Sequence, residues 1–381
     1  MSRYRFSQVF LAALLWLAAC DLRAAPQYTV TRLPSFIAAI NNQGDAAGIA
    51  ATTPPYLQAI LWSGGTSTYL GSLANGGSRA FGINDLGQVV GDSHAAPLES
   101  GTTHAFLYSG GVMTDLGTLG GGNSTAVAIN AGGQVAGTAD TALGRQHAFR
   151  YSAGYLLDLG TLDGYSSTAM DINRSGDVVG ESGGHAFVYR DGLRDLGAPG
   201  GYSIARAIND AGQVVGLSGS SPIDGRAVLY ADGEMTDLGT LGRSFSAAFD
   251  INNHGKIVGW TDVEGVDGRL AFLYADGRMR TLDSLLAGGT QASMSMAWAI
   301  NDAGQILASG CDSAACGSYL LTPVPEPAAW LMAASGLGLL ALRRLRRHAS
   351  RPECTPRAPR TPRPPSQSRA VCGSGMAARG V

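Results

Sequence analysis

The feature that most constrains the fold is a repeat that runs through most of the 381-residue sequence. An Ile-Asn pair recurs at spacings of 36 to 49 residues, and each copy is accompanied by an aromatic-aliphatic segment such as HAFLY. The asparagines of the seven pairs are Asn41, Asn84, Asn130, Asn173, Asn209, Asn252 and Asn301. Self-similarity at such a period predicts supersecondary units that cannot bury their apolar faces alone and stack on one another.

Each unit is predicted to contain four short strands. Runs of four to six residues rich in Val, Ile, Phe, Tyr and Leu are separated by Gly, Asn, Asp and Ser, which is typical of strands and turns. The turn after each Ile-Asn pair reads NAGG, NDAG or a close variant, and a glycine always closes it. Asparagine bonds its own backbone and glycine accepts a positive φ, so this pattern predicts a hairpin. A second hairpin is predicted where Gly-Gly or Asp-Gly interrupts LYSGGVMTDL and LYADGEMTDL.

The strands show little alternation of polar and apolar residues, so both faces of each sheet need cover. A four-stranded sheet of about 43 residues that packs against its own kind is a β-propeller blade. Residues 26–322 are therefore predicted to form an all-β, seven-bladed β-propeller, in preference to an open β-solenoid. The sequence allows two phases, which differ in the strand that begins each blade. If a blade begins with the strand of the Ile-Asn pair, the segment at Tyr28 completes the last blade and covers its edge. The other phase needs no such clasp, and both phases stay open.

The N-terminal residues 1–25 are predicted to be a secretory signal peptide. Two arginines, Arg3 and Arg5, precede an apolar stretch that ends in an alanine-rich site. Cleavage after Ala24 is favoured, and the rival interpretation is lipoprotein-type processing at Cys20 in the sequence LAAC. Either route leads through the Sec pathway to an exported protein.

Export implies an oxidising compartment, which bears on two cysteines in the last unit. Cys311 and Cys316 flank a short loop, so a local disulfide is predicted, with a pair of free thiols as the alternative.

Between Ala24 and Leu342 the chain has 14 basic and 27 acidic residues. Nucleic acid is therefore excluded as a partner, because phosphate binding needs Lys and Arg on the contact face.

The C-terminal region contains three consecutive elements. A Pro-Glu-Pro motif precedes fifteen mostly apolar residues, 328–342, and a basic cluster follows. A helix of that length reaches ~22 Å, which is short for a comfortable membrane span. The cluster should stay cytoplasmic, so the helix would hold the repeats transiently on the export side of the inner membrane. The clustered arginines are Arg343, Arg344, Arg346 and Arg347.

Residues 323–347 resemble the PEP-CTERM sorting signal. The resemblance implies that an exosortase, a membrane-embedded protease, recognises Pro325, Glu326 and Pro327, removes the tail and passes the protein toward the surface of an exopolysaccharide-producing Gram-negative bacterium. The middle of the chain is similar to the HAF-repeat family of extracellular proteins, named for a triplet that this sequence repeats. Residues 348–381 depart from the sorting signal, which normally ends soon after the arginines, and are predicted to be disordered.

The repeated polar residues include candidates for metal binding and catalysis. The triplet histidines His104, His147 and His185 lie in different blades, whereas zinc ligands converge within ~2.1 Å of one point, so no metal site is predicted. The Asn-Asp-x-Gly turns are interpreted as turns rather than calcium ligands. No catalytic motif or cofactor fingerprint is found in the sequence. The chain is predicted to be a non-enzymatic binding or structural module with extracellular polysaccharide as candidate ligand; the alternative is a glycan-active enzyme with its site at the propeller axis.

Overall fold

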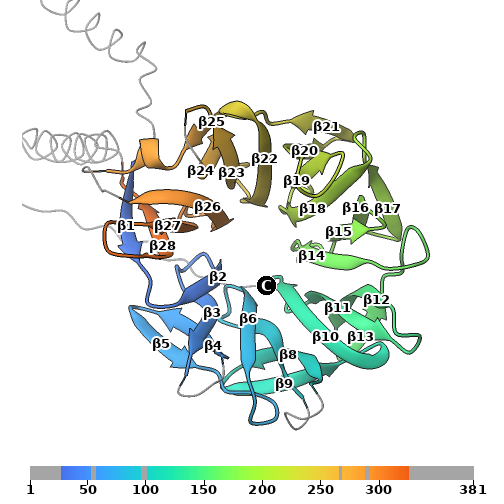
Figure 1. The fold of residues 1–381 in the computed structure, drawn as a ribbon. Helices are drawn as coiled ribbons and strands as arrows, with labels where there is room; N and C mark the ends of the chain where they lie inside the picture. Colours follow the sequence, from blue (N-terminus) through green and yellow to red (C-terminus); the bar gives the residue numbers. More distant parts are fainter. Residues whose placement is uncertain (1–26, 53–56, 96–100, 266–267, 288–291, 326–381) are drawn as a thin grey trace, which may run out of the picture. The chain divides into compact units, whose positions relative to one another are not determined.

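The computed structural model describes residues 27–52, 57–95, 101–265, 268–287 and 292–325. Within these ranges the chain forms seven four-stranded antiparallel sheets arranged around a central axis (Figure 1). The prediction of a seven-bladed β-propeller is therefore confirmed. Each sheet begins with the strand that leads into an Ile-Asn pair, which lies next to the axis.

Six blades are built from consecutive strands. Blade 1 contains β2 (Phe36–Ile40), β3 (Ala46–Ala51), β4 (Leu57–Ser63) and β5 (Thr66–Tyr69); blade 2 contains β6 (Ser78–Ile83), β7 (Val89–His94), β8 (Thr103–Ser109) and β9 (Val112–Gly117). Blade 3 contains β10 (Gly120–Ile129), β11 (Val135–Thr141), β12 (Gln146–Ser152) and β13 (Tyr155–Asp158); blade 4 contains β14 (Thr168–Ile172), β15 (Val178–Ser182), β16 (His185–Tyr189) and β17 (Leu193–Gly197). Blade 5 contains β18 (Tyr202–Ile208), β19 (Val214–Gly219), β20 (Arg226–Ala231) and β21 (Glu234–Asp237); blade 6 contains β22 (Gly242–Ile251), β23 (Ile257–Val263), β24 (Arg269–Ala275) and β25 (Arg278–Thr281), followed by the 3-10 turn η2 (Asp283–Leu285).

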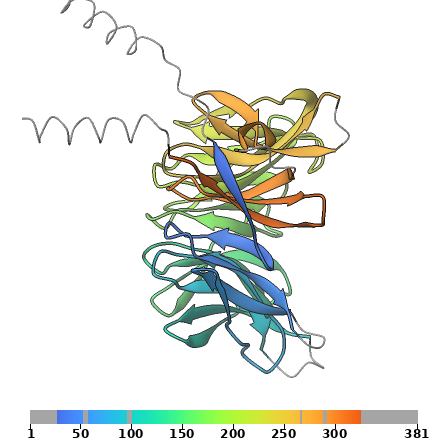
Figure 2. The ribbon, with the colours of Figure 1, turned by 90° about the vertical axis from the view of Figure 1, so that its left-hand side faces the viewer.

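The seventh blade joins the two ends of the repeat region. It contains β26 (Ser293–Ile300), β27 (Ile306–Cys311), β28 (Cys316–Pro323) and the N-terminal β1 (Tyr28–Arg32), in the order β1-β28-β27-β26. Figure 2 shows β1, in blue, beside the orange and red strands of this blade. Tyr28 pairs with Pro323 and is fully buried. Of the two phases left open by the sequence, the structure has the one with the N-terminal clasp.

The first hairpin of each unit follows the predicted turn chemistry. In blade 3 the Asn130 amide donates to the Gln134 carbonyl at 3.0 Å, and the Gly133 amide donates to the Asn130 carbonyl at 3.0 Å. Gly133 has a φ of 76°, a conformation that a residue with a side chain adopts only at a cost. The closing glycine is therefore required by the turn geometry.

The hydrophobic core lies between blades rather than inside any one of them. The phenylalanines of the HAF triplets are fully buried: Phe106 packs with residues of blade 1 such as Leu70, and Phe149 packs with residues of blade 2 such as Leu116. A fully buried phenylalanine contributes roughly 1.5–3 kcal/mol. Because every blade depends on its neighbour for this burial, closure by β1 stabilises the whole ring.

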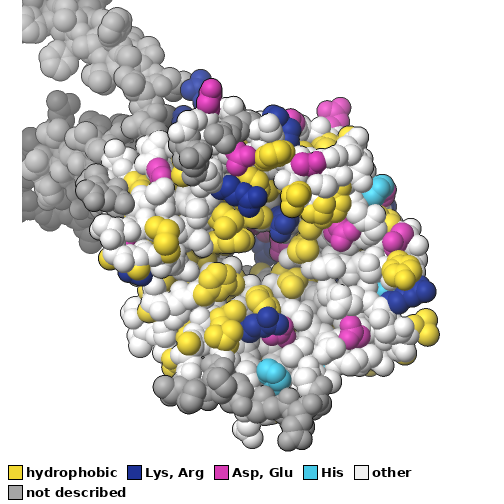
Figure 3. All heavy atoms as spheres, viewed as in Figure 1, with side chains coloured by type: hydrophobic (Ala, Val, Ile, Leu, Met, Phe, Trp, Pro, Cys, Tyr) yellow, Lys and Arg dark blue, Asp and Glu magenta, His cyan; other side chains and the backbone are white. Residues whose placement is uncertain are grey.

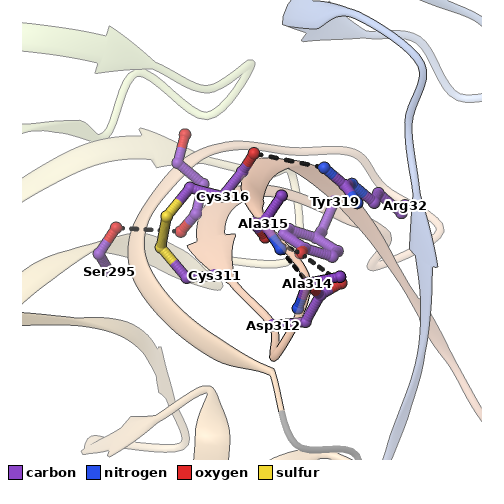
Figure 4. Close-up of a disulfide and its surroundings, with 9 residues drawn as sticks. Arg32, Ser295, Cys311, Asp312, Ala314, Ala315, Cys316 and Tyr319 are labelled. Carbon is purple, nitrogen blue, oxygen red and sulfur yellow. Dashed lines mark hydrogen bonds between the residues drawn. A yellow bond between two sulfur atoms is a disulfide. The ribbon is translucent and has the colours of Figure 1, made fainter.

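The hairpin of β27 and β28 carries the disulfide, as Figure 4 shows. Cys311 and Cys316 are bonded at an S–S distance of 2.03 Å. The loop between them is shaped by Asp312, whose carboxylate accepts the amide of Ala314 at 2.8 Å and the hydroxyl of Tyr319 at 3.0 Å. Arg32 of β1 donates to the Cys316 carbonyl at 3.4 Å, so the clasp strand contacts this hairpin as well.

Several predicted elements fall outside the described residues. These are the signal peptide with Cys20, the motif residues Glu326 and Pro327, the apolar segment 328–342 and the arginine cluster. Within the described part of the chain, no helix has the length and apolar character needed to cross a membrane. The sorting and anchoring interpretation therefore stays a prediction.

Candidate functional site

A closed ring of asparagines surrounds one end of the axial channel. The Nδ2 of Asn84 donates to the Asn130 carbonyl of the next blade at 3.0 Å, and the same bond recurs at every blade junction, including that from Asn301 to Asn41 at 2.9 Å. The donor–acceptor distances of the other five bonds are between 2.9 and 3.3 Å. We call the seven asparagines of the repeat the asparagine ring; each is 4–5% exposed.

Each member of the asparagine ring also shapes its own hairpin. The Oδ1 of Asn130 accepts the amides of Gly132 and Gln134, both at 3.0 Å. One side chain thus stabilises a turn and links two blades. The prediction that these turns are structural agrees with this geometry, but the bonds between blades were not foreseen from the sequence.

The residues after the asparagines line a cavity of about 220 Å³ at the same end of the channel. Here the carboxylate of Asp85 accepts the amide of Asn42 at 2.8 Å, and that of Asp302 accepts the amide of Asn253 at 2.8 Å. Among the described residues, no group of three or more His, Cys, Asp or Glu is arranged to hold a metal ion. The carboxylates at this mouth thus act as acceptors for backbone amides.

Further along the channel, every innermost strand contains a β-bulge. In blade 3, Ala126 pairs with Gly137 and Ala128 pairs with Ala136, so Val127 is left without a partner. A Cβ atom on Gly137 would overlap the carbonyl oxygen of Thr125, so this glycine allows the two strands to approach at the bulge. Bulges redirect side chains, and here they direct one residue of each blade toward the axis.

The unpaired residues of the seven bulges form a second set around the channel, which we call the bulge ring. Its members are Ala38, Phe81, Val127, Met170, Arg206, Phe249 and Trp298. Five of them line a cavity of about 190 Å³. Figure 3 looks along the axis and shows an opening bordered by hydrophobic side chains with a few basic and acidic ones among them. Unlike the asparagine ring, this set differs from blade to blade.

Three consecutive members of the bulge ring form a stack. The guanidinium carbon of Arg206 lies 4.8 Å from the ring centre of Phe249, and that ring is stacked on Trp298 with centres 5.0 Å apart and planes at 9°. Trp298 is held in turn by a bond from Nε1 to the Ser309 hydroxyl at 2.7 Å. Burial lowers the pKa of Arg206. Its Nε is buried and has no hydrogen-bond partner among the described residues.

Two carboxylates line the same cavity one residue beyond the bulges. Asp171 accepts the amides of Ile172 at 2.8 Å and Ile208 at 2.9 Å, so it links blade 4 to blade 5. Asp250 bonds Ile251 and Ile300 in the same way. Burial raises the pKa of Asp171 to about 7, aided by the charge of Asp250, and that of Asp250 to about 6.

The HAF histidines lie far from this site, on the outer strands. Each pairs with an aspartate of its own blade: His104 with Asp115 at 2.8 Å, and His147 with Asp158 at 2.9 Å. His185 pairs with Asp195 at 2.8 Å. In blade 5 an Arg226–Asp237 pair at 2.8 Å takes the same place. The histidines therefore fix the outermost strand of separate blades and do not converge.

A set of buried serines was missed in the sequence. Ser124 accepts the Ala105 amide of the preceding blade at 2.8 Å and donates to the Gly117 carbonyl at 2.5 Å. Equivalent bonds are made by Ser78, Ser167, Ser203 and Ser246. A signal was present, since a serine lies six residues before the asparagine in every unit. These serines stabilise the blade junctions and take no part in the channel.

Comparison with known proteins supports the fold and leaves the activity undefined. Residues 194–315, less than half of the chain, match a family model described as a protein of unknown function (DUF3466). No curated protein matches the chain in sequence.

Solved structures with a similar fold share little sequence with this chain. One is the β-propeller domain of the Trilobed protease from Pyrococcus furiosus, with a TM-score of 0.50 and 8% identity over 77% of this chain and 98% of that domain. That propeller is described as having an open velcro topology, whereas here β1 completes the seventh sheet. Another is YCF48 bound to D1 peptide, with a TM-score of 0.49 and 11% identity over 79% of this chain and 96% of that one. Identities this low show the fold alone.

Proposed function

We propose that this protein is an exported, non-enzymatic binding module whose ligand enters the axial channel at the bulge ring. The observation that carries the proposal is the loss of repeat equivalence at one position. The asparagine ring is the same in all blades, whereas the bulge ring contains Arg206, Phe249 and Trp298 on one side only. Residues that only hold neighbouring blades together can be the same in every repeat. A ligand site instead combines apolar side chains with a few polar groups at one place, so its residues differ between repeats.

The proposed location follows from the two ends of the sequence. The N-terminal segment has the pattern of a signal peptide, and the C-terminal segment has the pattern of a sorting signal cleaved by an exosortase. Pro325 and Pro327 would keep the helix that the sequence predicts for residues 328–342 from extending upstream, so Glu326 would be available to a protease. The mature protein would then reach the cell surface or the medium, where extracellular polysaccharide is the candidate ligand.

Cell fractionation with an antibody to the repeats tests this proposal. We expect the mature form at the surface or in the medium, and a purely cytoplasmic protein would refute export. Replacement of Pro325, Glu326 and Pro327 by alanine should leave export intact and retain the full-length form in the membrane. If the mature form of the unaltered protein still contains residues 328–347, the segment is a permanent anchor and the sorting proposal is wrong.

A glycan-active enzyme is the second candidate, because Asp171 and Asp250 place two carboxylates in the channel with raised pKa values. Such pairs serve as general acid and base in glycoside hydrolysis. Here, however, each carboxylate already accepts two backbone amides, which favours a structural role. Hydrolysis of a polysaccharide panel that is abolished by Asp171→Asn in a folded protein would establish the enzyme instead.

A further inference from the structure

Arg206 is a half-buried cation that no carboxylate among the described residues neutralises. Two other arginines show the contrast: Arg79 pairs with Asp92 at 2.6 Å, and Arg190 pairs with Asp177 at 2.8 Å. Arg206 forms no ion pair among the described residues, and its Nε has no acceptor there. A charge that is partly withdrawn from water without a counter-charge is unfavourable in folding, so its presence calls for an explanation.

The Arg206 guanidinium is held in place without being neutralised. Its contact with Phe249, at 4.8 Å, is a cation–π interaction worth about 0.5–2 kcal/mol, which holds the guanidinium over the ring but supplies no negative charge. Phe249 is supported from its other face by Trp298. The stack therefore orients the N–H donors of Arg206 beside the cavity in advance, as a binding site for an anion requires.

The two nearby carboxylates do not take the role of partner. Asp171 and Asp250 line the same cavity as Arg206, but their oxygens accept the amides of the isoleucines that lead into the asparagine ring. Arg206 thus lines a cavity of about 190 Å³, and its Nε has no hydrogen-bond partner within the described part of the chain. This volume is below the 300–1,000 Å³ of sites for drug-sized ligands, so the cavity fits a single small unit.

From this arrangement we infer that Arg206 binds the carboxylate of one acidic sugar unit, whose apolar C–H face rests on the aromatic and aliphatic members of the bulge ring. The inference deepens the binding function proposed above and rests on it. A guanidinium binds a carboxylate through two parallel N–H bonds, which gives it geometric selectivity over a neutral hydroxyl group. Phe81, Val127 and Met170 supply the apolar lining on the remaining sides.

The test compares three oligosaccharides on the full chain by titration calorimetry. Tetragalacturonate presents carboxylates, its methyl ester presents the same sugars without charge, and cellotetraose is neutral. We expect tetragalacturonate to bind at least about ten-fold more tightly than its ester, since a hydrogen bond to a charged group is worth more than one to a neutral group. Equal affinity for the acid and the ester would overturn the inference.

Variants assign the effect to one side chain. Arg206→Gln removes the charge at similar length and should weaken tetragalacturonate binding about ten- to hundred-fold. Arg206→Lys keeps the charge but loses the two parallel N–H donors of the guanidinium, so it should weaken tetragalacturonate binding less than Arg206→Gln does. The matched control is Arg145→Gln, because Arg145 stacks on Tyr165 away from the channel and its loss should leave binding unchanged. Unchanged melting temperatures would show that the variants fold, and undiminished binding by folded Arg206→Gln would refute the site.

The outcomes separate this inference from the proposed function. Binding of cellotetraose that does not depend on Arg206 would leave an exported binding module but remove the acidic-sugar site. Equal competition by benzoate, a carboxylate without a sugar, would show that the ligand is a small organic acid and would overturn the sugar assignment. Absence of binding to all three oligosaccharides would refute the inference, while fractionation would still decide export.

Discussion

The asparagine ring and the bulge ring occupy neighbouring positions on the same seven strands but are used in opposite ways. At the asparagine ring, one residue type repeats seven times and each copy makes the same bond to the next blade. Three residues earlier, at the bulge ring, the side chain is unpaired in the sheet and differs between blades. In this propeller, repeated residues build the ring, and departures from the repeat mark the candidate site.

The largest expected effect comes from opening the ring. Deletion of Gln27 to Pro34 removes β1, the buried Tyr28 and the buried Leu33, and leaves β28 as an exposed edge. We expect the melting temperature measured by circular dichroism to fall by roughly 10 °C or more, because each blade depends on its neighbours for burial. A synthetic peptide of residues 27–34 should restore part of the loss, whereas an unchanged melting temperature would show that the clasp does not hold the ring.

The next effect tests the structural role of the asparagine ring. Asn130→Ala removes the bond to blade 4 and leaves the amides of Gly132 and Gln134 without their side-chain acceptor. The free energy of unfolding in urea should fall by about 2–4 kcal/mol. Asn123→Ala, at an exposed position of the same strand, is the control and should cost less than about 1 kcal/mol. Similar losses in the two variants would remove the distinction between ring and surface asparagines.

Asp171 and Asp250 predict a pH dependence of stability. Their folded-state pKa values, about 7 and about 6, lie above the ordinary aspartate pKa of 3.8, so the folded protein binds these protons more tightly than the unfolded chain. Their contribution is complete below pH ~4, declines as the pH rises and is lost above about 7. The double variant Asp171→Asn/Asp250→Asn should therefore lose less stability than the unaltered protein between pH 5 and pH 8, as urea unfolding would measure. An identical pH profile would show that these carboxyl groups are not perturbed.

The smallest expected effect has the opposite sign. Arg206→Met replaces a half-buried charge that forms no ion pair among the described residues with an apolar side chain, so stability should stay equal or rise by about 1 kcal/mol while ligand binding is lost. Arg79→Met is the matched control: it leaves Asp92, only 2% exposed, without its partner and should destabilise the protein. A clear loss of stability in Arg206→Met would mean that Arg206 is structural and that the bulge ring resembles the asparagine ring.

Much of the fold could be predicted from the sequence because local chemistry determines it. The Asn-x-x-Gly turns define hairpins, and the number of Ile-Asn pairs gives the number of blades. The role of Tyr28 could not be fixed, since both blade phases satisfy the same local pattern and only the closed ring distinguishes them. The bond from Asn84 to blade 3 was also beyond reach, because it depends on the rotation between blades.

The candidate site was harder to predict than the fold for a related reason. The bulge that exposes Val127 to the channel is a change in pairing between two strands, and the strand pattern AVAI does not show it. When the seven repeats are aligned with one another, Arg206, Phe249 and Trp298 are merely variable residues within an apolar strand. Only their shared place at the bulges, and the stacking distances of 4.8 and 5.0 Å, bring them together as a site.

The most direct test of the central claim is amide hydrogen–deuterium exchange of the full chain with and without tetragalacturonate. A ligand at the bulge ring should slow exchange in the inner strands β18, β22 and β26, which carry Arg206, Phe249 and Trp298. The outer strands with the repeated His–Asp pairs should not change. Protection that is absent, spread evenly over the seven blades or confined to outer strands such as β9 and β13 would contradict the claim that departures from the repeat mark the ligand site.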